Sequence, residues 1–258
     1  MRRIIGLLVL AALFVVPSLA FAESQPVGFY IAPKFIASST WIEKFGVNGA
    51  RYAGGGTYVP IDNEKSDTTF GGALAIGYDF GKRTKVPVRF ELEYAMFSEI
   101  VGDAPSNLHW LIGGDPMDFD IKQKMDVRTA FVNIYYDVHS GDPDVPFSFW
   151  VGGGLGTAFI DSKSDFYIRI PAVNYTESWS TAGSKKTTNF AWNVGIGVGY
   201  DFTSNLTLDV GYRFASLGKA DTNAGRGSLF YVLWGLDQST EAKQIYMHQF
   251  MLGLRLGF

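Results

Sequence analysis

Apolar residues recur at every second position along most of this chain, with small or polar residues between them. Between residues 69 and 80, for example, Phe70, Leu74, Ile76 and Tyr78 alternate with glycine, alanine and threonine. A period of two is typical of a β-strand, because successive side chains point to opposite faces of a sheet. The alternation predicts eight strands, at residues 27–37, 69–80, 86–96, 129–138, 147–159, 189–202, 206–214 and 249–258.

The two faces of these strands differ in a way that favours a membrane barrel. One face carries bulky aliphatic and aromatic residues, and the other is rich in glycine and alanine. Transmembrane barrels place the bulky apolar face towards lipid, and small residues suit a narrow interior. A soluble lipocalin-like barrel, with its large apolar residues inside, is the alternative. We therefore predict an all-β fold, an eight-stranded antiparallel up-and-down transmembrane β-barrel.

The lengths of the connections predict an orientation. Three are short (residues 81–85, 139–145 and 203–205), and four are long (residues 38–67, 99–125, 161–186 and 217–243). Outer-membrane barrels have short periplasmic turns and longer extracellular loops. This pattern predicts a bacterial outer-membrane location, with both termini in the periplasm and four loops outside the cell.

The first 22 residues predict a secretory signal peptide. Arg2 and Arg3 precede an apolar stretch at residues 4–16, and Ala20-Phe21-Ala22 is a small-x-small cleavage pattern. An uncleaved anchor helix is the alternative, but the stretch is too short to span a bilayer. Cleavage would leave residues 23–258 as one barrel domain, and losing the two arginines would change the net charge from −3 to −5.

Composition excludes several other classes. The chain has no cysteine, so it has no disulfide, thiolate metal site or cysteine nucleophile. Its acidic net charge gives no basic excess for binding nucleic acid. Metal-ligand spacing is absent, and the glycine run at residues 152–156 lies inside a predicted strand, not in a phosphate-binding loop. We expect no cofactor and no metal.

Several segments resemble a known family. The last strand ends at Phe258 and has Leu252, Leu254 and Leu256 at alternate positions, which is similar to the assembly signal of bacterial outer-membrane barrels. The segments FELEY (90–94), FVNIYYD (131–137) and WNVGIGVGY (192–200) are similar to the opacity and surface-antigen porins, which share an eight-stranded barrel with OmpA. The resemblance implies contact with outer-membrane lipid, lipopolysaccharide and the barrel-assembly machinery. In some members it also implies adhesion to a host or another extracellular ligand.

A group of charged residues falls on the predicted inner face: Arg89, Glu91, Glu93, Asp209, Arg213 and Arg255. The third and seventh strands are opposite each other in an eight-stranded ring, so their side chains can meet across the lumen. Buried charges must be paired, because an unpaired one costs several kcal/mol. One interpretation is a salt-bridged plug, since eight strands leave an interior just wide enough for side chains to fill. The other is a gate, in which an exchange of partners opens a narrow ion channel.

Short Tyr-Asp repeats end three of the predicted strands, at Tyr78-Asp79, Tyr136-Asp137 and Tyr200-Asp201. Tyrosine at these positions suits the periplasmic aromatic girdle. We assign the aspartates to the turns or to the inner face, and not to a cation site.

The histidines allow one enzymatic alternative. His139 and Ser140 fall in a predicted periplasmic turn, whereas His248 lies near the outer end of the last strand on the lipid-facing side. A lipid A-modifying enzyme would need a nucleophile beside His248, and Ser38 and Ser216 are near the right height. A histidine in the interfacial girdle is the simpler interpretation, and we expect no catalytic residue.

The long connections are rich in aromatic residues, among them Trp110, Trp179, Phe230, Tyr231 and Trp234. Exposed aromatics beside Ser, Gly and Asn suit contact with protein or glycan. Alternatively, the strands extend beyond the membrane and the rings pack together as a cap. We expect a non-enzymatic surface protein of structural or adhesin type, with these loops as its contact surface. A narrow ion-gated channel and a lipid A-modifying enzyme are the alternatives.

Overall fold

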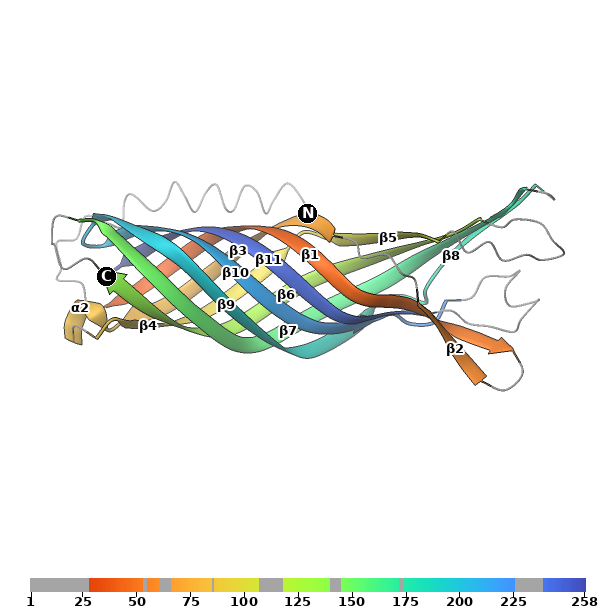
Figure 1. Ribbon diagram of the computed structural model, residues 1–258, viewed down its shortest axis with the longest axis horizontal. Coiled ribbons are helices and arrows are strands. Elements are labelled where there is room, and N and C mark those ends of the chain that lie inside the picture. The colour runs from red at the N-terminus through yellow and green to blue at the C-terminus, as the bar shows by residue number, and fades with distance from the viewer. Residues whose placement is uncertain are drawn as a thin grey trace.

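A closed ring of eight antiparallel strands forms the body of the protein (Figure 1). The computed structural model describes residues 28–52, 55–60, 66–84, 86–106, 118–139, 145–171, 174–225 and 239–258. In spatial order the ring contains β1 (Phe29–Tyr52), β3 (Ser66–Asp79), β4 (Val88–Phe97), β6 (Asp118–His139), β7 (Phe147–Ile170), β9 (Lys185–Thr203), β10 (Leu206–Asp221) and β11 (Ser239–Gly257). Pairing of β1 with β11 closes the ring, and the predicted fold is confirmed.

Three shorter strands lie at one end of the ring. β2 (Gly55–Pro60), β5 (Ile100–Ser106) and β8 (Tyr175–Ser180) pair with β1, β6 and β7 respectively. The short helix α2 (Gly81–Thr84) and the C-terminus lie at the opposite end (Figure 1). By the usual architecture of such barrels, the end with the short turns faces the periplasm.

A band of exposed apolar side chains surrounds the middle of the ring. On β6, Val132, Ile134, Tyr136 and Val138 are each about half exposed, whereas the residues between them are buried. The pattern repeats on the other ring strands, which is the arrangement that a hydrocarbon environment favours. Among the described residues, no helix is long and apolar enough to cross a membrane.

Aromatic residues border this band at both ends. On the extracellular side Trp41, Tyr246, Phe214 and Trp192 lie on four adjacent strands, with successive ring centroids 5.4–6.1 Å apart. On the periplasmic side Tyr78 packs against Phe29 and Phe80, and Tyr200 against Phe147 and Phe202. Belts of this kind mark the two membrane interfaces.

Beyond the extracellular belt the two faces of the strands exchange character, so that apolar side chains point inward and polar side chains point outward. On β6, Ile121, Met125 and Val127 are buried inside, while Asp120 and Lys122 are exposed on the outer face. Water now surrounds the strands, so the apolar side chains turn inward. Large parts of the predicted long loops are therefore strands: β1 runs to Tyr52, β7 to Ile170 and β10 to Asp221. For the described residues, the strands do extend beyond the membrane band; whether the aromatic rings pack together as a cap stays a prediction.

The extension divides into two sheets, β5-β6-β7-β8 and β2-β1-β11-β10, which splay apart in Figure 1. The β9–β10 ladder ends at Trp192 and Ser216. Beyond it, side chains and an isolated backbone bridge between Thr181 and Gly225 join the sheets. The Nδ2 of Asn189 donates to the carbonyl oxygens of Leu217 (2.9 Å) and Lys219 (2.7 Å). These contacts make the extension a packed continuation of the barrel.

Candidate functional site: the ionic lumen

Two ion-pair networks cross the lumen inside the membrane band. In the upper one, Lys34 binds both Glu91 and Glu93, with 2.7 Å between Lys34 Nζ and Glu93 Oε2. Across the barrel, Nη1 of Arg213 lies 2.6 Å from Glu93 Oε1, and its Nε donates to Gln249 Oε1 at 2.6 Å. The side chains of both glutamates are fully buried, so these cations are their counter-charges.

The lower network lies nearer the periplasm. Nε of Arg89 lies 2.7 Å from Asp137 Oδ2, and its Nη1 lies 3.8 Å from Asp209 Oδ2. Arg255 binds the same carboxylate of Asp209, with Nε 2.7 Å from Oδ2. Asp209 therefore links β4 to β11 through two guanidinium groups.

The charges in these networks balance. They comprise four cations and four carboxylates: Lys34, Arg89, Arg213, Arg255, Glu91, Glu93, Asp137 and Asp209. Ionisable side chains inside a membrane protein are costly unless they pair with one another. The balance makes the cluster a neutral core.

All six lumen residues singled out from the sequence lie in these networks. Sequence reasoning missed Lys34 and left Asp137 between a turn and the inner face; Asp137 lies on the inner face, 3% exposed and paired with Arg89. Lys34 lies an even number of positions from Tyr30, Ala32 and Ile36, so it lies on the same inner face of the strand. This spacing could have identified it.

Aromatic rings fill the space around the charges. The hydroxyls of Tyr30 and Tyr135 donate to Glu91, at 3.1 and 3.2 Å. Tyr135 packs edge-on against Trp150, with ring centroids 5.4 Å apart, and the guanidinium of Arg89 lies 4.5 Å from the Tyr135 ring centre. These rings exclude water from the ion pairs, which strengthens the electrostatic attraction.

The glycines on the inner face leave the space that these rings occupy. A Cβ on Gly197 or on Gly211 would collide with the Trp150 ring, and one on Gly152 would collide with Tyr135. The glycine-rich inner face is therefore a set of sockets for aromatic side chains and does not line an open bore.

An apolar layer lies in the lumen above the charges. Ile36, Met247, Leu217 and Ile245 are at most 1% exposed and belong to one cluster with Phe131. This cluster continues into the extracellular extension through Ile121 and its neighbours, so the barrel and the extension share one continuous apolar core.

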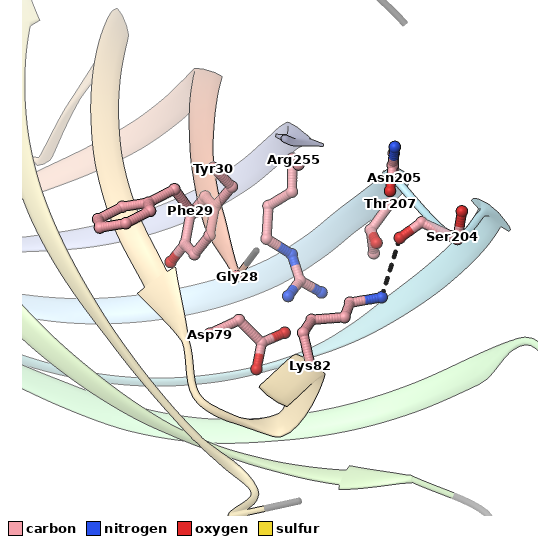
Figure 2. Close-up of a pocket in the computed structure, with 10 residues that line it drawn as sticks. Gly28, Phe29, Tyr30, Asp79, Lys82, Ser204, Asn205, Thr207 and Arg255 are labelled. Carbon is pink, nitrogen blue, oxygen red and sulfur yellow. Dashed lines mark hydrogen bonds between the residues drawn. The ribbon is translucent and has the colours of Figure 1, made fainter. Parts of the chain in front are cut away.

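A shallow pocket forms the periplasmic mouth of the lumen. Figure 2 shows Lys82 reaching across it to the carbonyl oxygen of Ser204 (3.0 Å) and Arg255 extending into it. Tyr30 stands at its inner wall, and beyond it lie the ion pairs.

The three aspartates of the Tyr-Asp repeats have separate roles. Asp79 Oδ1 accepts from the backbone N–H of Gly81 (2.8 Å), as a turn-capping residue does, and Asp201 Oδ1 accepts from the Thr207 hydroxyl (2.5 Å). Asp137 is the lumen residue described above. Among the described residues, no group of three or more His, Asp or Glu side chains is arranged to hold a metal.

The surroundings of His248 do not match the enzymatic alternative. Nδ1 of His248 is hydrogen-bonded to the hydroxyl of Tyr212 (2.6 Å), and its ring packs against Phe214. Ser38 is buried on the inner side of the wall, and the hydroxyl of Ser216 accepts from Gln244 Nε2 (2.7 Å). The two serines proposed from the sequence as nucleophiles are thus not placed beside the imidazole.

Of the five predicted loop contacts, the structure describes only Trp179. Trp179 lies in β8 and is half-buried, stacked on Phe166 with centroids 5.5 Å apart, so it packs the extension and is not an open loop contact. The other four, Trp110, Phe230, Tyr231 and Trp234, lie outside the described residues, as do Ser140 and the predicted signal peptide. In the C-terminal strand, Leu252, Leu254 and Leu256 lie on the outward side, and Phe258 stacks on Phe29.

One charged network lies on the extracellular extension. Nζ of Lys124 lies 2.6 Å from Asp165 Oδ2, and the hydroxyl of Ser180 donates to Asp165 Oδ1 (2.7 Å). The hydrogen bond from Lys124 lowers the pKa of the Asp165 carboxyl from its ordinary value. This network ties β6, β7 and β8 together on their outer face.

An apolar outer band, aromatic belts at both ends and a balanced ionic lumen define a small outer-membrane-type β-barrel. Residues 8–258 match the family model described as "Outer membrane protein beta-barrel domain", and the chain belongs to this family. Its location is the bacterial outer membrane.

The chain is also similar to several individual proteins. The chain is 30% identical over 239 residues to Outer membrane protein PagN of Salmonella typhimurium, covering 90% of each chain. It is 26% identical over 155 residues to an uncharacterized protein of Brucella suis, covering 57% of this chain and 53% of that one. Among solved structures, it is similar to the outer membrane protein OprG of Pseudomonas aeruginosa, with a TM-score of 0.46, 15% identity and coverage of 91% and 98%.

Proposed function

We propose that this protein is a non-enzymatic surface-binding protein of adhesin type, whose extracellular extension presents the contact surface. The observation that supports this most directly is that, beyond the extracellular belt, the strands bury apolar side chains inside and expose polar side chains outside. On β7, Ile160, Phe166 and Ile168 are buried, while Lys163 and Tyr167 are exposed. A packed extension of this kind would hold the outer face of its strands away from the lipid surface.

The filled lumen supports a binding role over transport. Trp150, Tyr135 and the ion pairs occupy the section inside the membrane, and Ile36 and Met247 lie in the apolar layer above them. We propose that the lumen residues act as a plug that holds the strands together. A gated channel is the second candidate, because the Glu93 carboxylate already has two cationic partners, Lys34 and Arg213, between which it could exchange.

The C-terminal residues carry a separate proposal. We propose that Leu252, Leu254, Leu256 and Phe258 form the signal that the barrel-assembly machinery recognises. Outward-facing leucines at alternate positions on β11, together with a terminal aromatic residue, support it.

The binding proposal is tested by adhesion of bacteria that display the protein to cultured epithelial cells. Replacing residues 109–112 and 229–234 with Gly/Ser should abolish adhesion, while heat-dependent gel mobility shows that the barrel is intact. As a matched control, Gly/Ser replacement of residues 61–65 and 140–144 should leave adhesion unchanged. Equal adhesion by all forms would overturn the assignment of contact to the aromatic segments.

A further inference from the structure

A layer of polar side chains crosses the apolar core within the extracellular extension. Gln123 on β6, Ser164 on β7 and Thr240 on β11 are fully buried, and Thr222, directly after β10, is 3% exposed. The layer therefore draws on both sheets of the extension. Burying a polar group costs free energy unless a hydrogen bond replaces its contact with water, so each of these side chains needs a partner.

Three of the four side chains form a row of hydroxyls that joins the two sheets. Ser164 Oγ lies 2.7 Å from Thr240 Oγ1, which in turn lies 3.1 Å from Thr222 Oγ1. Thr222 Oγ1 also accepts from the backbone N–H of Thr240 (2.9 Å). Each hydroxyl carries one proton, and the two contacts within the row use two of the three. One proton is left for an acceptor outside the row, which ends on β7 at Ser164.

The amide of Gln123 lies next to this end of the row. In the part of the chain that the structure describes, neither Oε1 nor Nε2 of Gln123 has a hydrogen-bond partner. Its inward neighbours along β6, Ile121 and Met125, are apolar and offer none. Gln123 is directly opposite Ser164 in the β6–β7 ladder, where the Cβ atoms of such a pair lie about 4.5–5.5 Å apart. Its neighbour on the other side is Gly102 of β5, which has no side chain to fill the space.

We propose that Gln123 and Ser164 bind ordered water inside the extension. The water would accept the proton of the Ser164 hydroxyl and donate to Gln123 Oε1, which continues the row of hydrogen bonds from β6 to Thr222. Buried water typically makes about three hydrogen bonds to polar groups that would otherwise be unpaired. Because hydrogen bonds are directional and apolar contacts are not, the completed layer fixes how the two sheets align. This inference does not depend on the proposed adhesin function.

A double-mutant cycle in the full-length mature chain, unfolded by urea in detergent micelles, tests the shared water. Gln123→Met and Ser164→Ala each leave the water with one partner, and each should raise the unfolding equilibrium constant about tenfold. The double variant should be about tenfold less destabilised than the product of the two single effects, because no half-bound water remains. The matched control is Ser162→Ala, whose hydroxyl donates to the Asp221 carbonyl oxygen (2.6 Å). Its effect should simply multiply that of Gln123→Met.

A crystal structure of the same protein identifies what occupies the space. We expect electron density for water within about 3.2 Å of both the Gln123 amide and Ser164 Oγ. Density showing a direct bond between the amide and the hydroxyl, or no water beside them, would overturn the proposal. So would a cycle in which Ser164→Ala and Gln123→Met act independently, or in which the Ser162→Ala control couples as strongly. A more stable Gln123→Met variant would show that the amide is buried dry.

Discussion

At the scale of single residues, the lumen depends on complementary partners that face one another across the barrel. Glu93 on β4 is bound by Lys34 on β1 and Arg213 on β10, three strands that are distant in sequence. The alternation of the sequence was enough to place Glu93 and Arg213 on the inner face and to predict that they meet. It did not reveal Lys34, because the sequence pattern alone did not assign the residues of the first strand to the inner or the outer face. It also did not reveal that glycines make room for the aromatic rings.

Removing one partner of the buried ion pair should be costly. Arg213→Met leaves Glu93 with Lys34 as its only cation and should lower the free energy of unfolding by about 3 kcal/mol. The double variant Arg213→Met with Glu93→Gln should recover much of that loss, because no unpaired charge remains. Urea unfolding in detergent micelles measures both, and a loss below about 1 kcal/mol in the single variant would contradict a buried pair.

The fit between glycine and tryptophan can be tested at Gly197. A methyl group there collides with the Trp150 ring, so Gly197→Ala should lower the unfolding free energy by about 1–3 kcal/mol. Gly257→Ala is the control, because its Cβ would have no neighbour closer than 3.7 Å. Adding Trp150→Leu to Gly197→Ala should recover part of the loss, because it relieves the collision with the ring but not the one with the backbone carbonyl oxygen of Val210. A fully additive loss would argue against the contact with Trp150.

At the scale of elements, each long strand changes its environment along its length. On β6 the apolar residues face outward from Ala130 to Val138 and inward from Ile121 to Val127. The lipid-facing half was predictable because it follows the rule for membrane barrels. From the sequence, the extracellular half is predicted as loop because its apolar residues lie on the opposite face, although the same two-residue period continues through it.

The β6–β7–β8 sheet should show a pH-dependent contribution to stability. The pKa of Asp165 is lowered in the folded state by Lys124, so its contribution is present at neutral pH and is lost as the pH falls from about 4 through the folded value. Asp165→Asn should lower the thermal midpoint slightly at pH 7, by the equivalent of no more than about 0.5 kcal/mol for a partly exposed pair. The two proteins should have the same midpoint at pH 2. A difference that persists at that pH would assign the effect to packing and not to charge.

At the scale of the whole molecule, the interior of the barrel has three layers along its axis. A pocket opens to the periplasm, a neutral ionic layer lies within the membrane, and an apolar core begins above that layer and continues through the extension. The eight-stranded ring and its orientation followed from strand period and connection length. Whether the lumen is plugged or gated could not be decided from the sequence, because it depends on which side chains meet across the strands.

The most direct test of the sealed lumen is single-channel conductance of the refolded mature chain in a planar bilayer. The wild type should be silent, while Trp150→Ala combined with Tyr135→Ala should produce discrete openings, because it removes the rings that fill the sockets around the ion pairs. Heat-dependent gel mobility must first show that both proteins are folded. Discrete openings in the wild type that change in Arg213→Ala and Glu93→Ala would contradict the plug and establish the gated channel instead.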